Sequence, residues 1–245
     1  MTVTAPRHAP QYSPPPRRYL RPVQPLHFPA VDAEDMGETT RHLALRTALW
    51  QAIQLGFAGR LAAGSDQFVY WNGRDPSACC APDVFVCLGK PQTAFATWKT
   101  WEQGTPELAI EIISAGDTRD RPWDQKLARY RELGCSELVR FDPDDVRRPL
   151  RIWDRIQDDL VERDPTDPLF SRCDTLGAFF CIRDDELYGP WLYLARDPDG
   201  RHPFPSEAEA RQREAEARQR EADARRRAEA EVRRLKAKAK RGKRR

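Results

Sequence analysis

Apolar residues are grouped along the chain in short blocks, and the spacing inside each block predicts one element of secondary structure. From Thr39 or Thr40 to Phe57 they recur every three or four positions, which predicts a helix. Two blocks rich in β-branched and aromatic residues, 67–71 and 83–88, predict strands. The apolar positions of the helix are Leu43, Leu45, Leu49, Ile53 and Leu55.

The block from residue 108 to residue 113 is apolar on both of its alternating faces, which predicts a central strand covered on both sides. Glu111 is the exception within it. A buried carboxylate is costly unless a cation, a metal ion or several hydrogen-bond donors meet it. Two interpretations stay open for Glu111: a structural ion pair with an arginine, or a functional site.

A polar loop over residues 115–121 separates this strand from a second predicted helix, which starts at Pro122 and ends before Gly134. Lys126 borders the apolar face of that helix. A helix that follows a strand packs back over the sheet, so Lys126 can reach the carboxyl end of the Glu111 strand. The alternative is a lysine that extends from the edge of a packed face into water.

The later blocks predict a strand at 138–141 and an edge hairpin formed by 151–156 and 160–163. Residues 175–194 hold further apolar pieces that the pattern does not place. Because strands and helices are interleaved, we expect an α/β domain, of the α+β kind with a mixed sheet.

Composition divides the 245 residues into three parts. The first thirty residues contain eight prolines, and the last forty consist almost entirely of Ala, Glu, Arg, Gln and Lys, so neither end can bury a core. We therefore expect a Pro-rich disordered leader over residues 1–30 and a globular domain over 31–199. A charged helical arm with a basic tail is expected over 200–245.

No stretch approaches the roughly 18 apolar residues of a membrane span, and the leader lacks the apolar segment of a secretory signal. We therefore expect a cytoplasmic protein without a membrane partner. The six cysteines show no C-x-x-C pair or other zinc spacing, which favours reduced thiols packed as small hydrophobes. The four histidines are scattered, so any metal site is expected to use carboxylates.

The arm carries a seven-residue repeat, because EAEARQR at 207–213 recurs at 214–220 and two related heptads follow. Its paired alanines lie about 200° apart on a helix and build no continuous apolar seam, which argues against a coiled coil. The repeat instead places acids four residues before arginines, and such pairs stabilise a solvated helix. We expect a lone helix on the order of 50 Å long, and a coiled coil stays open as the alternative.

Basic residues gather at the end of the arm. Residues 225–245 hold twelve Lys or Arg against two Glu, a net charge of +10, so the other 224 residues sum to −7 within the overall +3. This tail predicts sequence-independent attraction to nucleic-acid phosphates, which salt weakens. A merely solubilising tail is the alternative. The candidate phosphate contacts are Arg233, Arg234, Lys236, Lys238, Lys240, Arg241, Lys243, Arg244 and Arg245.

The predicted order of elements (helix, strand, strand, strand, helix, strand) resembles the common core of restriction-endonuclease-like nucleases. The sequence at the corresponding places is similar to that of the Uma2 family of restriction endonucleases, within the PD-(D/E)XK superfamily. The similarity covers most of residues 35–165. The matching positions are APDV at 81–84, PELAIEIIS at 106–114, Lys126, Tyr130, Gly134, Glu137 and FDP at 141–143.

The resemblance implies that Asp83 and Glu111 are metal ligands, joined by the main-chain carbonyl of Ile112, and that Lys126 is the catalytic lysine. Two carboxylates from adjacent strands suit Mg²⁺, a hard cation that also takes water and phosphate oxygens, and Mn²⁺ is an expected substitute. The superfamily usually keeps its lysine two residues after the glutamate, where this chain has Ile113. In the Uma2 family the lysine lies on the following helix, as Lys126 does.

Glu38, Ser114 and Tyr130 are expected to be accessory residues of the same site. Ser114 and Tyr130 belong to the matching positions. Glu38 stands four residues before His42 at the start of the first helix, and a helix cap with a solvated first turn explains that pair better than a site does.

Together these features predict a Mg²⁺-dependent endonuclease that hydrolyses phosphodiester bonds in DNA. Two alternatives stay open. A catalytically silent nuclease-like module would bind nucleic acid or a protein partner through its basic arm, and a purely structural domain would hold Glu111 against an arginine. Nucleases of the superfamily often act as dimers, so a homodimer is a further open expectation.

Overall fold

The computed structural model describes residues 38–114, 123–164, 167 and 169–242; within the last helix it describes the side chains of residues 210–212 and 214–229. The predicted leader and the loop over 115–121 lie outside the described residues. Within the described part of the chain, no helix is long and apolar enough to cross a membrane.

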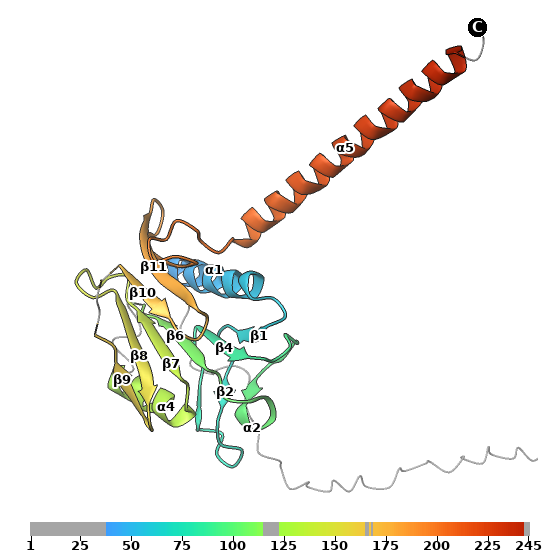
Figure 1. Cartoon of the computed structure of the whole chain (residues 1–245). Coiled ribbons are helices and arrows are strands. Elements are labelled where there is room, and N and C mark those ends of the chain that lie inside the picture. The colour runs from blue at the N-terminus through green and yellow to red at the C-terminus, as the bar shows by residue number, and fades with distance from the viewer. Residues whose placement is uncertain (1–37, 115–122, 165–166, 168, 243–245) are drawn as a thin grey trace, which may run out of the picture.

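A six-stranded mixed sheet forms the centre of the domain (Figure 1). Its strand order is β1-β4-β6-β7-β8-β9, in which β6 and β7 are parallel and every other neighbouring pair is antiparallel. The α/β class with a mixed sheet is therefore confirmed. The strands are β1 (Leu61–Gly64), β4 (Val84–Leu88), β6 (Leu108–Ile112), β7 (Glu137–Phe141), β8 (Leu150–Ile156) and β9 (Asp159–Glu162).

The first helix begins where the sequence predicted, because the Thr39 side chain accepts a hydrogen bond from the main-chain nitrogen of His42 at 3.2 Å. Its buried face is narrower than predicted, since Leu43 and Leu55 are 48% and 41% exposed. Their assignment to the core was wrong because both lie outside the stripe that meets the sheet. The helices are α1 (Thr40–Gly56), α2 (Thr100–Gln103), α4 (Trp123–Leu133) and α5 (Glu207–Gly242).

Strand β6 is buried on both faces, as its pattern predicted. Leu108, Ile110 and Ile112 join an apolar cluster shared with α1 and a second sheet. Ala109, which points the other way, joins a cluster shared with α4. Any polar side chain on this strand is therefore enclosed, whichever face it occupies.

The connection from β6 through α4 to β7 is a parallel crossover. Helix α4 ends at Gly134, whose φ of 89° is in the left-handed region that glycine adopts without strain. Tyr130 and Leu133 are the buried residues of α4. This connection lays α4 across the face of the sheet that carries Glu111.

The first core strand was predicted wrongly. It is β1, whose sequence LAAG has low strand propensity and becomes a strand through pairing with β4. The predicted strand at 67–71 exists only as β2 (Val69–Tyr70), which belongs to a separate small sheet. The other strands of that sheet are β3 (Cys79–Cys80) and β5 (Trp98–Lys99).

Residues 175–194, which the pattern did not place, form most of a three-stranded antiparallel sheet that packs against α1. The side chains on its inner face, Ala178, Phe180, Leu192 and Leu194, are fully buried in the cluster around α1. The strands are β10 (Phe170–Cys173), β11 (Ala178–Asp185) and β12 (Gly189–Ala195). The predicted hairpin is confirmed as β8 and β9, with β9 at the edge of the main sheet.

All six cysteines are free thiols, and four of them are buried, in agreement with their prediction as small apolar residues. Burial raises the pKa of the Cys87 thiol to about 12, so this thiol stays neutral at ordinary pH.

The charged helix α5 leaves the domain beside the C-terminal end of α1 and projects away from it (Figure 1). Phe204, just before α5, lies against Phe57 with 4.9 Å between ring centroids. The 36 residues of α5 correspond to about 54 Å. Among the described side chains, the predicted four-residue pairs are present at Glu214–Arg218 and Glu216–Arg220; the pairs of Glu207 and Glu209 lie outside the described side chains.

A second buried carboxylate, Glu137 at the start of β7, ties the main sheet to the segment after β10. It is 2% exposed. Its oxygens accept hydrogen bonds from the main-chain nitrogens of Asp174 and Thr175 at 3.1 and 2.9 Å, and Arg163 lies 3.3 Å away. These donors satisfy a charge that would otherwise be costly to bury.

We predict that Glu137→Gln lowers the free energy of unfolding by about 1 to 3 kcal/mol, because it leaves a buried donor without its charged acceptor. The urea midpoint of wild type and variant, at unchanged slope, measures the loss. Glu132→Gln, at an exposed position on α4, is the matched control. Equal midpoints for the two variants would contradict this role of Glu137.

Candidate active site

Two buried carboxylates meet where β4 begins and β6 ends. Val84 pairs with Ile110 across the antiparallel strands, so Asp83 and Glu111 stand one residue beyond that pair on neighbouring strands. Asp83 is 7% exposed and Glu111 is 5% exposed. The positions proposed for metal ligands are thus adjacent and largely withdrawn from water.

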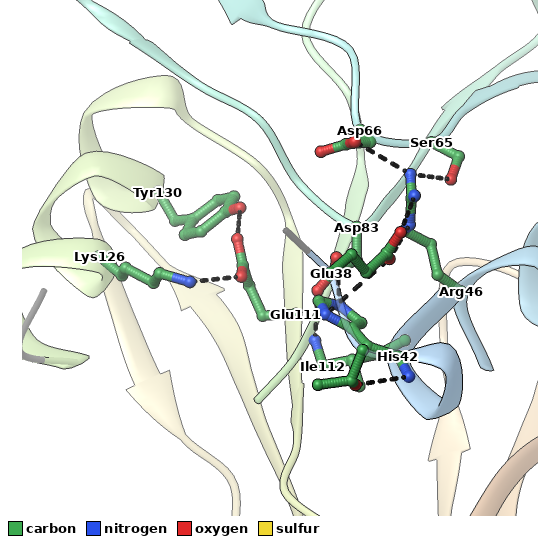
Figure 2. A network of polar contacts seen from close by, with 11 residues as sticks. Glu38, His42, Arg46, Ser65, Asp66, Asp83, Glu111, Ile112, Lys126 and Tyr130 are labelled. Carbon is green, nitrogen blue, oxygen red and sulfur yellow. Dashed lines mark hydrogen bonds and ion pairs between the residues drawn. The ribbon is translucent and has the colours of Figure 1, made fainter. Parts of the chain in front are cut away.

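Asp83 is held by one main-chain donor and one imidazole. Its Oδ2 accepts a hydrogen bond from the main-chain nitrogen of Ile112 at 2.6 Å. Its Oδ1 lies 2.7 Å from Nε2 of His42, which α1 carries in its first turn. Figure 2 shows the Asp83 side chain turned toward α1. Asp83 therefore links the mouth of β4 to β6 and to α1.

Glu111 is held by two side chains of α4. Lys126 Nζ donates to Oε2 at 2.9 Å, and the Tyr130 hydroxyl donates to Oε1. Burial raises the pKa of Glu111, the Lys126 charge opposes that shift, and the nearby Asp83 carboxylate adds to it. Burial, and then the Glu111 charge, raise the pKa of Tyr130 well above its ordinary value, so the phenol remains a donor.

Lys126 lies where the sequence predicted, at the carboxyl end of the Glu111 strand. Its side chain is only 18% exposed. The alternative, a lysine that extends into water, is therefore wrong. The partners of Glu111 are therefore a lysine and a tyrosine. The ion pair with an arginine, which the sequence had left open, is not the one that forms.

Three residues spaced by four border Asp83: Glu38, which lies just before α1, and His42 and Arg46, which lie on α1. Arg46 donates to both oxygens of Glu38 at 3.0 and 2.8 Å and lies 3.1 Å from Asp66. Glu38 Oε1 lies 3.9 Å from His42 Nδ1. Figure 2 shows that these three residues and Asp83 face one another.

The sequence pattern alone placed His42 in a solvated first turn and did not single out Arg46. Thr39 supplies the cap, which leaves the His42 ring directed at Asp83. The signal that could have found both residues is their spacing: His42 and Arg46 share one face of α1 because they are four residues apart, and Glu38 precedes them at the same spacing.

A pocket of about 220 Å³ opens beside Asp83. Ile112 and His42, the two residues that contact Asp83, both form part of its wall. The predicted accessory residue Ser114 lines it as well. The full lining is Thr39, Arg41, His42, Leu45, Ile112, Ile113, Ser114 and Pro143.

The donor set fits a hard divalent cation in its chemistry, since both carboxylates offer oxygen ligands. Figure 2 shows the two carboxylates turned to opposite sides, Glu111 toward α4 and Asp83 toward α1. Within the described ranges, no three His, Cys, Asp or Glu side chains are gathered to hold a metal ion. A cation at Asp83 and Glu111 would therefore complete its coordination with main-chain carbonyl, water or phosphate oxygens, as Mg²⁺ commonly does.

Two further predictions concern the main-chain carbonyl of Ile112 and the basic tail. The main-chain carbonyl of Ile112 stays a predicted ligand, while its nitrogen is engaged by Asp83. The basic tail belongs to α5, which leaves the domain beside the C-terminal end of α1. The carboxylates lie near the other end of α1, at His42. The side chains of the nine tail residues lie outside the described part of the chain.

The chain is similar to known proteins in sequence and in structure. The model of the family Uma2, described as "Putative restriction endonuclease", matches residues 33–174. A solved structure, of "a putative nuclease belonging to DUF820 from Anabaena variabilis ATCC 29413", is 16% identical, covers 54% of this chain and 72% of its own, and superposes with a TM-score of 0.39. No curated protein sequence matches the chain.

We predict that, without metal, wild type loses stability relative to Glu111→Gln as pH rises. Burial raises the folded-state pKa of Glu111. The folded state therefore holds the proton more tightly than the unfolded state. That stability is fully present below the ordinary glutamate pKa and is lost as pH rises through the raised value. Urea unfolding in EDTA from about pH 4 to pH 8 measures the difference. Glu102→Gln, at an exposed position, is the control. The prediction would be contradicted if the free energy of unfolding of wild type increased relative to that of Glu111→Gln as pH rises.

Proposed function

The chain belongs to the Uma2 family, and from that premise we propose that it is a divalent-metal-dependent nuclease that hydrolyses phosphodiester bonds in DNA. The observation that carries the proposal is the arrangement at the end of β6. Two buried carboxylates stand on neighbouring strands, and Lys126 reaches one of them from the following helix. A nuclease of this class needs those groups in that order.

Asp83 and Glu111 would hold the cation, for which Mg²⁺ is the first choice and Mn²⁺ the substitute because all the donors are oxygens. When bound, the cation would lower the pKa of a water molecule and offset the charge that develops on phosphate. Burial of the two carboxylates supports this role, since water competes weakly for buried ligands.

Lys126 would orient the attacking water and stabilise negative charge on the phosphate. Its ammonium lies 2.9 Å from Glu111 and is largely buried, so its position is defined. The Tyr130 hydroxyl holds the other oxygen of Glu111. We therefore assign Tyr130 a positioning role, in which it fixes the rotation of the Glu111 carboxylate.

His42 and the main-chain nitrogen of Ile112 would position Asp83 in the same way. Glu38 is paired with Arg46. We propose that this pair holds the first turn of α1 against the site and is not a ligand. Hydrogen bonds of this kind orient metal ligands and commonly affect metal affinity when removed.

The basic tail would add affinity for DNA without sequence preference. Helix α5 starts beside Phe57, at one end of α1, and His42 lies at the other end. The 17 residues of α1 span about 25 Å. The tail is therefore proposed to contact phosphates away from the site of cleavage.

A second function is favoured by one observation: every oxygen of Asp83 and Glu111 already has a protein donor or imidazole within 3 Å. The protein's own groups satisfy these oxygens without a metal ion. This is what we would expect of a catalytically silent nuclease-like module that binds through its arm. The melting temperature measured with added Mg²⁺ distinguishes the nuclease from the silent module. Mg²⁺ raises it only if the folded protein has a site that binds the ion.

We predict that the protein nicks supercoiled plasmid in Mg²⁺ or Mn²⁺. Asp83→Ala should abolish cleavage, because it removes a ligand. Lys126→Ala should slow it by about 10²- to 10³-fold, the usual range for the loss of one group that stabilises charge in the transition state. Glu111→Ala should lose Mg²⁺ binding, followed as the rise in melting temperature, while remaining folded.

Lys99→Ala is the matched control for Lys126→Ala, since Lys99 is paired with the exposed Glu102 outside the site. Metal-dependent nicking that persists in Asp83→Ala would overturn the assignment of the ligands. A wild type that binds DNA, shows no cleavage of double- or single-stranded DNA and gains no stability from Mg²⁺ would favour the silent module.

We predict that deletion of residues 225–245 weakens DNA binding and flattens its dependence on salt. For every phosphate that the shortened protein no longer neutralises, the slope of log K against log salt should fall by about 0.9. The control is deletion of residues 214–220, a neutral repeat that duplicates 207–213 and leaves the tail intact. Equal affinity and slope for the two deletions would show that the tail does not bind DNA.

A further inference from the structure

The pocket beside Asp83 has the size and walls expected for a flat heterocycle. Its volume is about 220 Å³, and a cavity of about 150 Å³ is known to hold a benzene ring. Leu45, Ile112, Ile113 and Pro143 provide apolar walls. A nucleobase is somewhat larger than benzene, so one base fits in volume.

The polar groups of the pocket suit the edge of a base better than a phosphate. Thr39 and Ser114 are hydroxyl residues of the lining; the Thr39 oxygen already accepts a hydrogen bond from the main-chain nitrogen of His42, but its proton can still be donated. The cation in the lining is Arg41, which donates to both oxygens of Asp144 at 2.9 and 2.8 Å. Because that charge is already compensated, the pocket offers an anion little attraction.

The pocket adjoins the proposed site of cleavage through two residues that contact Asp83, while Asp83, Glu111 and Lys126 are not in its lining. Ile112 is part of the pocket lining, and its main-chain nitrogen donates a hydrogen bond to Asp83. His42 lines the pocket and contacts the other oxygen of Asp83. A ligand in the pocket would therefore lie next to a phosphate held at Asp83, as a base lies next to its own phosphate.

We propose that this pocket binds the base of the nucleotide adjacent to the scissile phosphate, and that the substrate is DNA with an unstacked nucleotide, such as a single strand. The proposal rests on the proposed nuclease function and extends it to the form of DNA. A base inside a regular duplex is stacked on its neighbours and must be flipped out before it can enter a side pocket, at a cost in unstacking and unpairing. Single-stranded DNA avoids that cost.

A 12-nucleotide single strand of DNA that carries 2-aminopurine at one position tests the proposal when that position is moved along the strand. This base fluoresces more strongly when it leaves the stack, and no Phe, Tyr or Trp is among the described residues that line the pocket. Binding is measured in Ca²⁺, and cleavage of the same strand is measured separately in Mg²⁺. We expect brightening at one position only.

Ser114→Phe fills the pocket, and Ser136→Phe places the same side chain at an exposed position elsewhere. Equal melting temperatures confirm that both variants fold. We expect Ser114→Phe to lose the brightening and to bind the strand about tenfold more weakly than Ser136→Phe, because the new ring takes the volume in which the base would be buried. An abasic nucleotide at the responsive position should make the two variants equal.

The outcomes separate the inference from the proposed function. Cleavage and binding without brightening at any position, or with equal brightening in Ser114→Phe, would overturn the base pocket and leave the nuclease standing. A duplex of the same sequence that is bound and cleaved as fast as the single strand would also overturn it. If wild type neither cleaves nor binds DNA, the nuclease function is rejected, and the base pocket is rejected with it.

Discussion

The burial of Glu111 is the constraint on which the rest of the site depends. The residue sits at the end of a strand whose two faces are both covered, so its charge must be met by groups from the protein. Helix α4 supplies them in Lys126 and Tyr130, one turn apart on the same face. The ion pair thus fixes both the rotation of α4 and the place of the lysine.

Helix α1 is the second positioning element, and it joins parts of the molecule that are distant in the sequence. Its first turn brings His42 to Asp83, its middle packs on the main sheet and the β10–β12 sheet, and its last turn meets Phe204. At that last turn a side chain in place of Gly56 would collide with the Phe204 ring, since an added Cβ would lie 2.3 Å from it. The arm is therefore held at the end of α1 that is remote from the carboxylates.

The sequence predicted those parts of the fold that are governed by local pattern. The central strand, both core helices, the edge hairpin and the approach of Lys126 to Glu111 follow from apolar periodicity and the crossover rule. Strand β1 could not be predicted, because its LAAG sequence is a strand only through its partner β4. The role of His42 was missed because its contact spans 41 residues, and local reasoning favoured a cap that Thr39 provides.

In the proposed function, the charge distribution assigns affinity for DNA to the basic tail and selectivity to the rest of the protein. Outside the last 21 residues the chain carries a net charge of −7, so this part of the chain would supply little electrostatic attraction to DNA. The tail, at +10, would supply the attraction, and it acts equally on every phosphate backbone. Discrimination must then arise at the carboxylates and the adjoining pocket, where contacts depend on the shape of the bound nucleotide. A weakly attracting domain is suited to that task, because it engages DNA only where the local structure fits.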